Sequence, residues 1–246
     1  MDRSLHAIVH ALTSSRDENE VKFCLMDESV GQYFGAQHWG IEFYDEQLNL
    51  ISIDVRGIKN VDNFVERYQQ LGRGDDPLLG YVLKYHAPAH EETILPLGKW
   101  KQSKIYQNFC AYYNHEHTAI APIVYNGHLV AAIHLAPTKD WKAFSDRDLA
   151  CLSAVSLHCS TNITKLRTQK TSIDFSLANR LTRRELQIAE LVAQGLTNAE
   201  IGVRLWISIN TVKQTLKNIF RKLNVSTRAQ MVARLKGVLN YIDDYK

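Results

Sequence analysis

The sequence predicts an α+β protein of two domains: an N-terminal α/β/α sandwich with a mostly antiparallel sheet, and a C-terminal all-α domain of four helices. Three observations lead to this prediction. The 246 residues amount to about 1.6 domains at roughly 150 residues per domain. Two hairpin patterns, over residues 39–55 and 117–136, lie between segments with helical periodicity. Several helix-start signals crowd together after residue 180, with only three residues between two of the helices that they predict.

In the N-terminal domain, expected over residues 1–167, the spacing of apolar residues separates helices from strands. Apolar residues at intervals of three and four predict helices. The expected helices cover residues 5–12, 21–34, 60–71, 78–85, 101–113 and 146–167. Alternating or β-branched runs predict strands. The expected strands cover residues 39–44, 48–55, 93–95, 117–125 and 128–136. Together these elements predict a sheet of four or five strands framed by helices.

Short polar segments set where several of these elements begin and end. Residues 72–77, Gly-Arg-Gly-Asp-Asp-Pro, predict a loop. Asn126-Gly127 between two apolar runs is the strongest short-range hairpin signal. Ser145, with Asp148 three residues later, predicts the start of the long helix. The polar residues after that helix predict a linker over 168–178.

In the C-terminal domain, expected over residues 179–246, four N-cap residues predict four short helices. Thr182, Thr197 and Thr227 each precede a Glu or Gln by three residues, as in a capping box. Ser208 is a fourth N-cap residue. The expected helices cover residues 183–193, 198–205, 209–223 and 227–239. The short connection between the second and the third predicts a helix-turn-helix.

The charge of the chain is divided unevenly between the two domains. Residues 1–175 carry 17 Lys and Arg against 21 Asp and Glu, whereas residues 176–246 carry 12 against 5. On the expected third helix, Lys213, Lys217 and Arg221 are four residues apart and share one stripe. The DNA major groove admits one helix, and basic side chains neutralise phosphates. The basic domain therefore predicts double-stranded DNA as its partner.

Several motifs of the C-terminal domain closely resemble the DNA-binding domain of LuxR-type transcription regulators. They are Leu181-Thr182-Arg183-Arg184-Glu185, residues 193–201 and residues 208–213. This resemblance implies that Lys213, Gln214 and Lys217 read bases. It also implies that Asn210, Thr211, Arg221 and Lys222 lie near the DNA backbone.

The same family implies a homodimer on promoter DNA. By resemblance, the last helix would pair two domains through Met231, Leu235 and Leu239. RNA polymerase is a candidate partner of a regulator bound at a promoter.

The N-terminal domain resembles sensor domains. Residues 144–149 with the long helix look like the end of a GAF-type domain, and Phe64, Tyr68 and Asp76 resemble part of the acyl-homoserine lactone pocket of quorum-sensing LuxR regulators. Trp100 is a candidate second aromatic residue of this pocket. In such a site the carboxylate accepts an amide N–H and aromatic walls hold an apolar tail. The alternative is that Phe64 and Tyr68 are core residues and Asp76 is a helix cap.

Other functions lack their usual sequence signals. No apolar run is long enough to span a bilayer, so no membrane partner is expected. No metal-ligand spacing, phosphate loop or nucleophile motif is present, so we expect neither a metal, nor a cofactor, nor an enzyme. Four scattered cysteines indicate a reduced cytoplasmic setting. Cys151 and Cys159 are either inert buried thiols or a redox pair between two copies.

These observations predict a cytoplasmic, dimeric, sequence-specific transcription regulator with an N-terminal sensory domain. The signal would be a small molecule, with acyl-homoserine lactones among the candidates. The alternative is a ligand-independent regulator whose N-terminal domain only dimerises or docks a protein partner.

Overall fold

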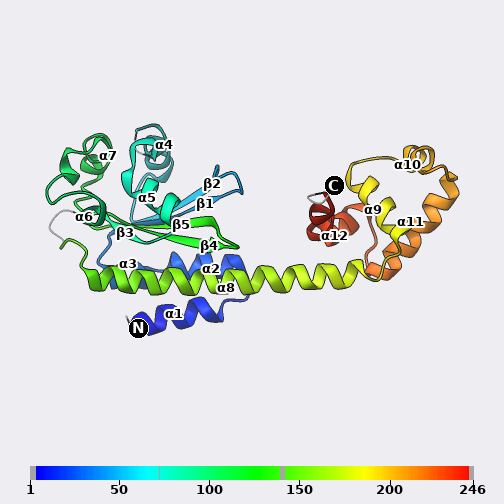
Figure 1. Cartoon of the computed structure of the whole chain (residues 1–246), viewed down its shortest axis with the longest axis horizontal. Coiled ribbons are helices and arrows are strands. Elements are labelled where there is room, and N and C mark those ends of the chain that lie inside the picture. The colour runs from blue at the N-terminus through cyan, green and yellow to red at the C-terminus, as the bar shows by residue number, and fades with distance from the viewer. Residues whose placement is uncertain (1–3, 72, 139–141, 244–246) are drawn as a thin grey trace. The chain divides into compact units, whose positions relative to one another are not determined.

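A five-stranded antiparallel sheet forms the centre of the N-terminal unit (Figure 1). The computed structural model describes residues 4–71, 73–138 and 142–243, without the side chains of 170–175, 177–178 and 236–243. The chain divides into two compact units, Met1–Leu166 and Arg167–Lys246. The strand order is β2-β1-β5-β4-β3. The strands are β1 (His38–Tyr44), β2 (Leu50–Arg56), β3 (Ala89–His90), β4 (Ala119–Tyr125) and β5 (His128–Ala136).

Two tight connections fix the two hairpins of this sheet. Between β1 and β2, the Asp45 carboxylate accepts hydrogen bonds from the backbone N–H of Gln47 at 2.9 Å and of Asn49 at 2.8 Å. Between β4 and β5, Asn126 and Gly127 have φ values of 50° and 79°. A two-residue turn with both φ values positive matches the twist of the strands, and the predicted hairpin is confirmed.

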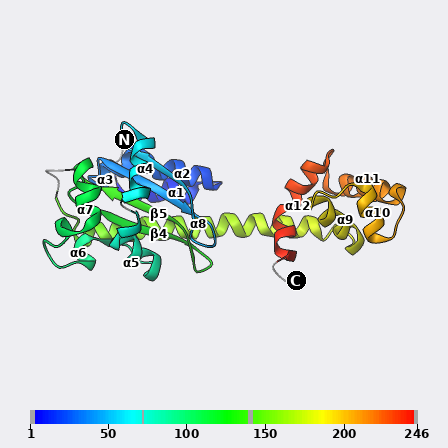
Figure 2. The same cartoon turned by 90° about the horizontal axis from the view of Figure 1, so that it is seen from above.

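Helices cover both faces of the sheet (Figures 1 and 2). One face packs on α2 (Glu18–Leu25), α3 (Glu28–Phe34) and the first half of α8 (Asp146–Ala178), and α1 (Leu5–Ser14) packs against these helices. The Asn162 amide on α8 donates to the carbonyls of Leu12 and Ser15, and so ties α1 to α8. On the same side, Ser156 donates to the Pro122 carbonyl and Ser160 accepts from the Val124 N–H at 3.0 Å, along the outer edge of β4.

The opposite face of the sheet is covered by short helices and turns. They are α4 (Val61–Leu71), η1 (Arg73–Asp75), α5 (Pro77–Tyr85), α6 (Glu91–Ile94), η2 (Trp100–Gln102), α7 (Lys104–Asn108) and η3 (Cys110–Tyr113). Because side chains alternate along a strand, the two faces of β1, β4 and β5 feed two separate apolar cores. The predicted fold class of this unit, a helix-covered antiparallel sandwich, is confirmed.

The C-terminal unit contains four helices after α8. They are α9 (Arg183–Ala193), α10 (Asn198–Leu205), α11 (Ile209–Leu223) and α12 (Arg228–Asp243). Thr182 and Thr197 form complete capping boxes with Glu185 and Glu200. Ile188, Ile201, Val212 and Ile219 are fully buried between the helices. The predicted four-helix domain is therefore confirmed.

Several predicted elements are wrong in kind or extent. The strand expected over 93–95 is absent, because His90 and Thr93 form a capping box that starts α6. The helix expected over 21–34 is broken at Asp27, whose carboxylate caps α3. The segment 101–113 is not one helix but η2, α7 and η3.

The ends of two predicted segments also differ from the structure. The long helix does not end near Arg167: α8 continues through Ala178, so residues 168–178, expected as a linker, are helical. Within the expected loop 72–77, residues Arg73–Asp75 form a 3-10 helix, and Gly72 lies outside the described residues. Among the helices that the structure describes, none is both long and apolar enough to cross a bilayer.

Candidate functional site

The outward face of α11 carries a set of exposed polar side chains. Ser208 caps the helix by accepting a hydrogen bond from the Thr211 N–H at 3.0 Å. Val212, Leu216 and Ile219 point into the domain core and fix the rotation of the helix. The exposed residues are Asn210, Thr211, Lys213, Gln214, Lys217 and Arg221. These are six of the seven predicted DNA contacts, so the structure brings them onto one helix face.

The turn before α11 is held by backbone contacts. A Cβ at Gly202 would lie 2.9 Å from the Ile207 carbonyl oxygen, and the Ile207 N–H donates to the Gly202 carbonyl at 3.0 Å. Arg184 donates to the Leu205 carbonyl at 2.7 Å, at the end of α10. Trp206, the residue that ends α10, has a φ of 56° and is 94% exposed. These contacts hold α10 and the turn together and so fix where α11 begins.

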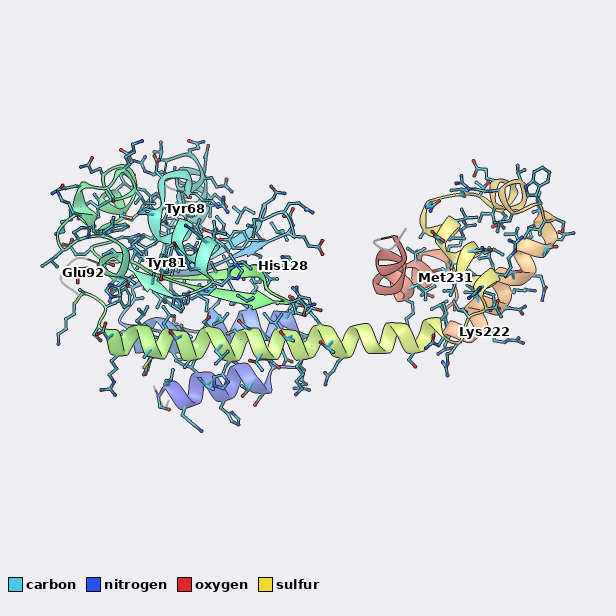
Figure 3. All side chains as sticks on the ribbon, in the orientation of Figure 1. Tyr68, Tyr81, Glu92, His128, Lys222 and Met231 are labelled. Carbon is cyan, nitrogen blue, oxygen red and sulfur yellow. The ribbon has the colours of Figure 1, made fainter. Side chains whose placement is uncertain are left out.

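Lys222 differs from the other predicted DNA contacts. Its ammonium donates to the Glu185 carboxylate at 2.6 Å, and the same carboxylate accepts from the Thr182 N–H at 2.7 Å (Lys222 is labelled in Figure 3). Burial by itself raises the pKa of the Glu185 carboxyl. The hydrogen bonds from Lys222 and Thr182 lower this pKa by more than burial raises it, so the pKa lies below its usual value. Lys222 therefore links α11 to the start of α9.

The structure also places the predicted dimer contacts. Met231 and Leu235 on α12 are 0% exposed and belong to the core of a single domain (Figure 3). A side chain that is fully buried within one copy is not available to a second copy, so the prediction that these two residues pair domains is wrong. The Leu239 side chain lies outside the described residues.

The second candidate site is a cavity between the sheet and α4–α7 in the N-terminal unit. It has a volume of about 60 Å³. The four predicted ligand residues, Phe64, Tyr68, Asp76 and Trp100, all line it and are at most 8% exposed. They come from α4, the start of α5 and η2, three elements that follow one another within about 40 residues of the sequence. The structure therefore brings together every residue of the predicted pocket.

Asp76 and Tyr68 form the polar side of this cavity (Tyr68 is labelled in Figure 3). The Tyr68 hydroxyl donates to Asp76 Oδ2 at 3.4 Å. Asp76 Oδ1 accepts from the N–H groups of Leu78 and Leu79, and so caps α5. Burial raises the pKa of Asp76 and holds the pKa of Tyr68 well above its usual value. Both roles predicted for Asp76, a cap and a cavity residue, are combined in one side chain.

The sheet contributes polar side chains to the cavity that the sequence did not single out. Glu42 on β1 is 1% exposed. Its Oε2 accepts from the Tyr44 hydroxyl at 2.5 Å and lies 3.4 Å from Arg73 Nε. Its Oε1 faces His134 Nε2 at 3.3 Å, without the alignment of a hydrogen bond. Glutamate is rarely buried, so a Glu within a strand whose neighbours on both faces are apolar is unusual. This is the sequence signal that could have located this side of the cavity.

Four side chains that line the cavity carry buried polar atoms with no hydrogen-bond partner among the described residues. These atoms are Glu42 Oε1, Trp100 Nε1, Thr118 Oγ1 and His134 Nε2. A buried polar group without a partner costs about 1–3 kcal/mol. Native proteins seldom leave such groups without partners, and four of them around one cavity mark it as the second candidate site.

One end of the cavity is closed by a pair of histidines. His38 Nδ1 and His115 Nε2 lie 2.7 Å apart. Burial lowers the pKa of His115 to about 3 and also lowers the pKa of His38. Both rings are therefore neutral at neutral pH, with one nitrogen donating to the other.

The cysteines are all free thiols in this structure. Cys159 is 0% exposed, and burial raises its pKa above the usual value. Cys151 accepts a hydrogen bond from the Tyr33 hydroxyl at 3.3 Å. A buried thiol with a raised pKa is a poor nucleophile.

The C-terminal domain is similar in sequence to known proteins. Residues 179–235 match the family described as "Bacterial regulatory proteins, luxR family". The transcriptional regulatory protein LiaR of Bacillus subtilis is 56% identical over 50 residues, which is 20% of this chain and 24% of that protein. A nitrate/nitrite response regulator protein homolog of Haemophilus influenzae is 41% identical over 69 residues, 28% of this chain and 33% of that protein.

The curated matches cover only part of each relative. The chain spans between 22% and 40% of the length of the first three relatives. Among solved structures, Escherichia coli SdiA matches over 95% of both chains with a TM-score of 0.43 at 14% identity. The N-acylhomoserine lactone dependent factor CepR2 of Burkholderia cenocepacia matches 67% of this chain and 96% of its own, with a TM-score of 0.47 at 11% identity. No function follows from similarity at this level.

Proposed function

We propose that this chain, whose residues 179–235 belong to the luxR family of bacterial regulatory proteins, is a sequence-specific transcription regulator gated by a small molecule. The exposed face of α11 is the single observation that supports DNA binding most directly. Lys213, Lys217 and Arg221 lie on one stripe of a rigidly held helix, with Asn210 and Gln214 beside it. Such a face combines phosphate neutralisation with base-edge hydrogen bonding.

The position of each side chain along α11 suggests which part of the DNA it would contact. Lys213 and Gln214 lie in the first two turns, where a recognition helix meets base edges. Arg221 lies in the last turn, and we assign it to a phosphate. Lys222 is paired with Glu185, so we assign it to the stability of the domain rather than to DNA.

The DNA-binding assignment predicts different effects for two variants. The preferred DNA sequence of the full chain is first selected from random duplexes, and binding is then measured by fluorescence anisotropy over a range of salt concentrations. Lys213→Ala is expected to cost about 1–3 kcal/mol and to relax the base preference. Arg221→Ala is expected to weaken binding to all DNA sequences alike. It should also reduce, by about 1, the slope of log affinity against log salt concentration.

Lys165 provides a matched control for this experiment, because it is exposed on α8 outside the four C-terminal helices. Lys165→Ala is expected to leave both affinity and salt slope unchanged. If Lys213→Ala and Arg221→Ala behave like Lys165→Ala, α11 is not the recognition helix.

The cavity supports gating over the alternative of a ligand-independent regulator. Its unpartnered polar atoms and its enclosed aromatic walls suit a bound small molecule. A ligand shifts an equilibrium only through unequal affinity for the two states. The test is to measure DNA affinity with and without each cavity ligand. If no ligand changes this affinity, the alternative holds, in which the N-terminal unit only dimerises or docks a protein.

A further inference from the structure

The charge inside the cavity is one-sided. Two carboxylates, Glu42 and Asp76, line it, while no Lys or Arg occurs among the described residues of its lining. Glu42 is 1% exposed and Asp76 8%, so water screens neither of them well. Arg73 balances one of these charges from outside the lining, through Glu42 Oε2. His134, which also lines the cavity, faces the other oxygen of Glu42 at 3.3 Å, so Asp76 is the carboxylate whose hydrogen bonds come from backbone N–H groups and a hydroxyl alone.

One carboxylate oxygen is available to a ligand. Glu42 Oε2 is occupied by the Tyr44 hydroxyl and by Arg73, whereas Glu42 Oε1 has no hydrogen-bond partner among the described residues. His134 Nε2, which also lacks a hydrogen-bond partner, lies 3.3 Å from Oε1, and the Tyr68 hydroxyl also interacts with the Glu42 carboxylate. An N–H donor that approaches from the cavity would satisfy Oε1.

Several aromatic side chains line the cavity, together with aliphatic ones such as Ile53, Val55 and Ile105. Phe64 packs edge-on against Phe109 with ring centroids 5.0 Å apart, and Tyr68 tilts against Phe109 at 5.1 Å. Trp100 completes this aromatic lining. Aromatic faces attract an organic cation, and the attraction is larger where water is excluded. Carboxylates and aromatic rings around one enclosed space are the chemistry that recognises an ammonium group.

We propose that the cavity binds a small organic amine, with its protonated amino group at Glu42 Oε1 and its hydrocarbon part against the aromatic walls. This inference rests on the proposed ligand-binding function of the N-terminal unit and names the class of ligand. The volume of about 60 Å³ limits the ligand to a few heavy atoms unless side chains move. Asp76, at the start of α5, adds a second carboxyl group to the lining.

Three molecules of nearly equal shape test the charge preference. Calorimetric titration of the full chain at pH 7 compares propylamine, 1-propanol and propanoate, which are cationic, neutral and anionic. We expect propylamine to bind at least tenfold more tightly than 1-propanol, and propanoate to bind most weakly. If 1-propanol or propanoate binds as tightly as propylamine, or if propylamine does not bind, the amine proposal is wrong.

A conservative variant tests the role of Glu42. Glu42→Gln keeps the shape of the side chain and an acceptor for Tyr44 but removes the charge, and we expect it to weaken propylamine binding at least tenfold. Glu66→Gln, on the exposed side of α4, is the matched control and should leave binding unchanged. Equal affinity of the Glu42→Gln variant and the wild type for propylamine would overturn the assignment.

Two further measurements keep this test decisive. If Glu42→Gln does not fold, as judged by circular dichroism, Asp76→Asn takes its place, with the same expected loss of propylamine affinity. Failure of the amine proposal is distinct from failure of the proposed function. A neutral ligand that binds in place of an amine and changes DNA affinity would overturn the amine proposal alone. If the α11 variants bind DNA like the wild type, the DNA-binding assignment fails while amine binding stands.

Discussion

Asp76 illustrates how one buried residue combines a structural and a chemical role. Its Oδ1 accepts two backbone N–H groups at the start of α5, and its Oδ2 accepts the Tyr68 hydroxyl. These bonds favour the ionised form, but burial outweighs them and raises the pKa above 3.8. Asp76 is therefore a buried carboxyl group at the wall of a cavity whose ionised form is disfavoured by burial, although the opposite charge of His134 also favours ionisation.

This raised pKa has a consequence for stability. A carboxyl group whose pKa is higher in the folded than in the unfolded state stabilises the fold fully below the unfolded pKa, and that stabilisation is lost as pH rises through the folded pKa. We expect Asp76→Asn, which keeps the oxygen that accepts both cap N–H groups, to have a higher Tm than the wild type at pH 7, with the difference shrinking towards pH 3.8. Thermal unfolding followed by circular dichroism across this pH range measures the difference.

The neighbouring Asp75 provides the control for this comparison, because it is exposed and pairs only loosely with Lys104. Asp75→Asn should show no such pH-dependent gain. A Tm of Asp76→Asn below that of the wild type at every pH would contradict the argument from burial.

The residues of the cavity show which parts of a site the sequence makes visible. Phe64, Tyr68 and Asp76 form a local pattern, and the structure places them together. Glu42 and His134 were not singled out, since each sits in a largely apolar strand without a recognisable motif around it. The antiparallel pairing of β1 and β5, which brings them within 3.3 Å, depends on contacts far apart in the sequence.

At the scale of an element, the connection between α10 and α11 contains a residue in an unfavourable conformation. Trp206 has a φ of 56°, in the left-handed region that suits glycine, and its side chain is 94% exposed. The left-handed conformation costs roughly 1–2 kcal/mol for a residue with a Cβ. Nothing buried in the described domain compensates for this cost at the Trp206 side chain.

Replacing Trp206 is therefore expected to stabilise the domain. Trp206→Gly should raise the free energy of unfolding by about 1 kcal/mol, because glycine adopts positive φ without steric cost while little apolar contact is lost. Trp206→Ala is the control, since alanine retains the Cβ and should bring no such gain. Chemical denaturation of the full chain measures both, and equal stability of the Gly and Ala variants would show that backbone strain is not the cause.

The helices of the C-terminal unit were predictable because their signals are local. Thr182, Thr197 and Ser208 each bond to a backbone N–H three residues ahead, so the sequence alone marks each start. The segment 168–178 shows the opposite case. Its polar composition suggested a linker, but residues 146–178 contain neither Gly nor Pro, and polarity without a breaker does not end a helix.

For the whole molecule, gating requires that the cavity and the DNA-binding surface influence each other. The two sites lie in different units, Met1–Leu166 and Arg167–Lys246. If a cavity ligand changes DNA affinity by some factor, bound DNA must change ligand affinity by the same factor. Such factors are typically about 5–150.

This reciprocity predicts a result that neither unit would give alone. We expect the Kd of the tightest-binding cavity ligand to differ at least fivefold between free protein and protein saturated with its preferred duplex. Titration calorimetry of both samples measures the ratio, and a scrambled duplex is the control. Identical ligand affinity in the three samples would mean that the units act independently.

The outer edge of β4 has a consequence for the behaviour of the protein in concentrated solution. Beyond Ile120, β3 no longer pairs with β4, and a bare strand edge invites a strand of another copy. Here Pro122 has no N–H to offer, and its carbonyl is bonded by Ser156, while Ser160 takes the N–H of Val124. One proline and two serines thus remove, at residues 122 and 124, backbone groups on which an intermolecular sheet would grow along this edge.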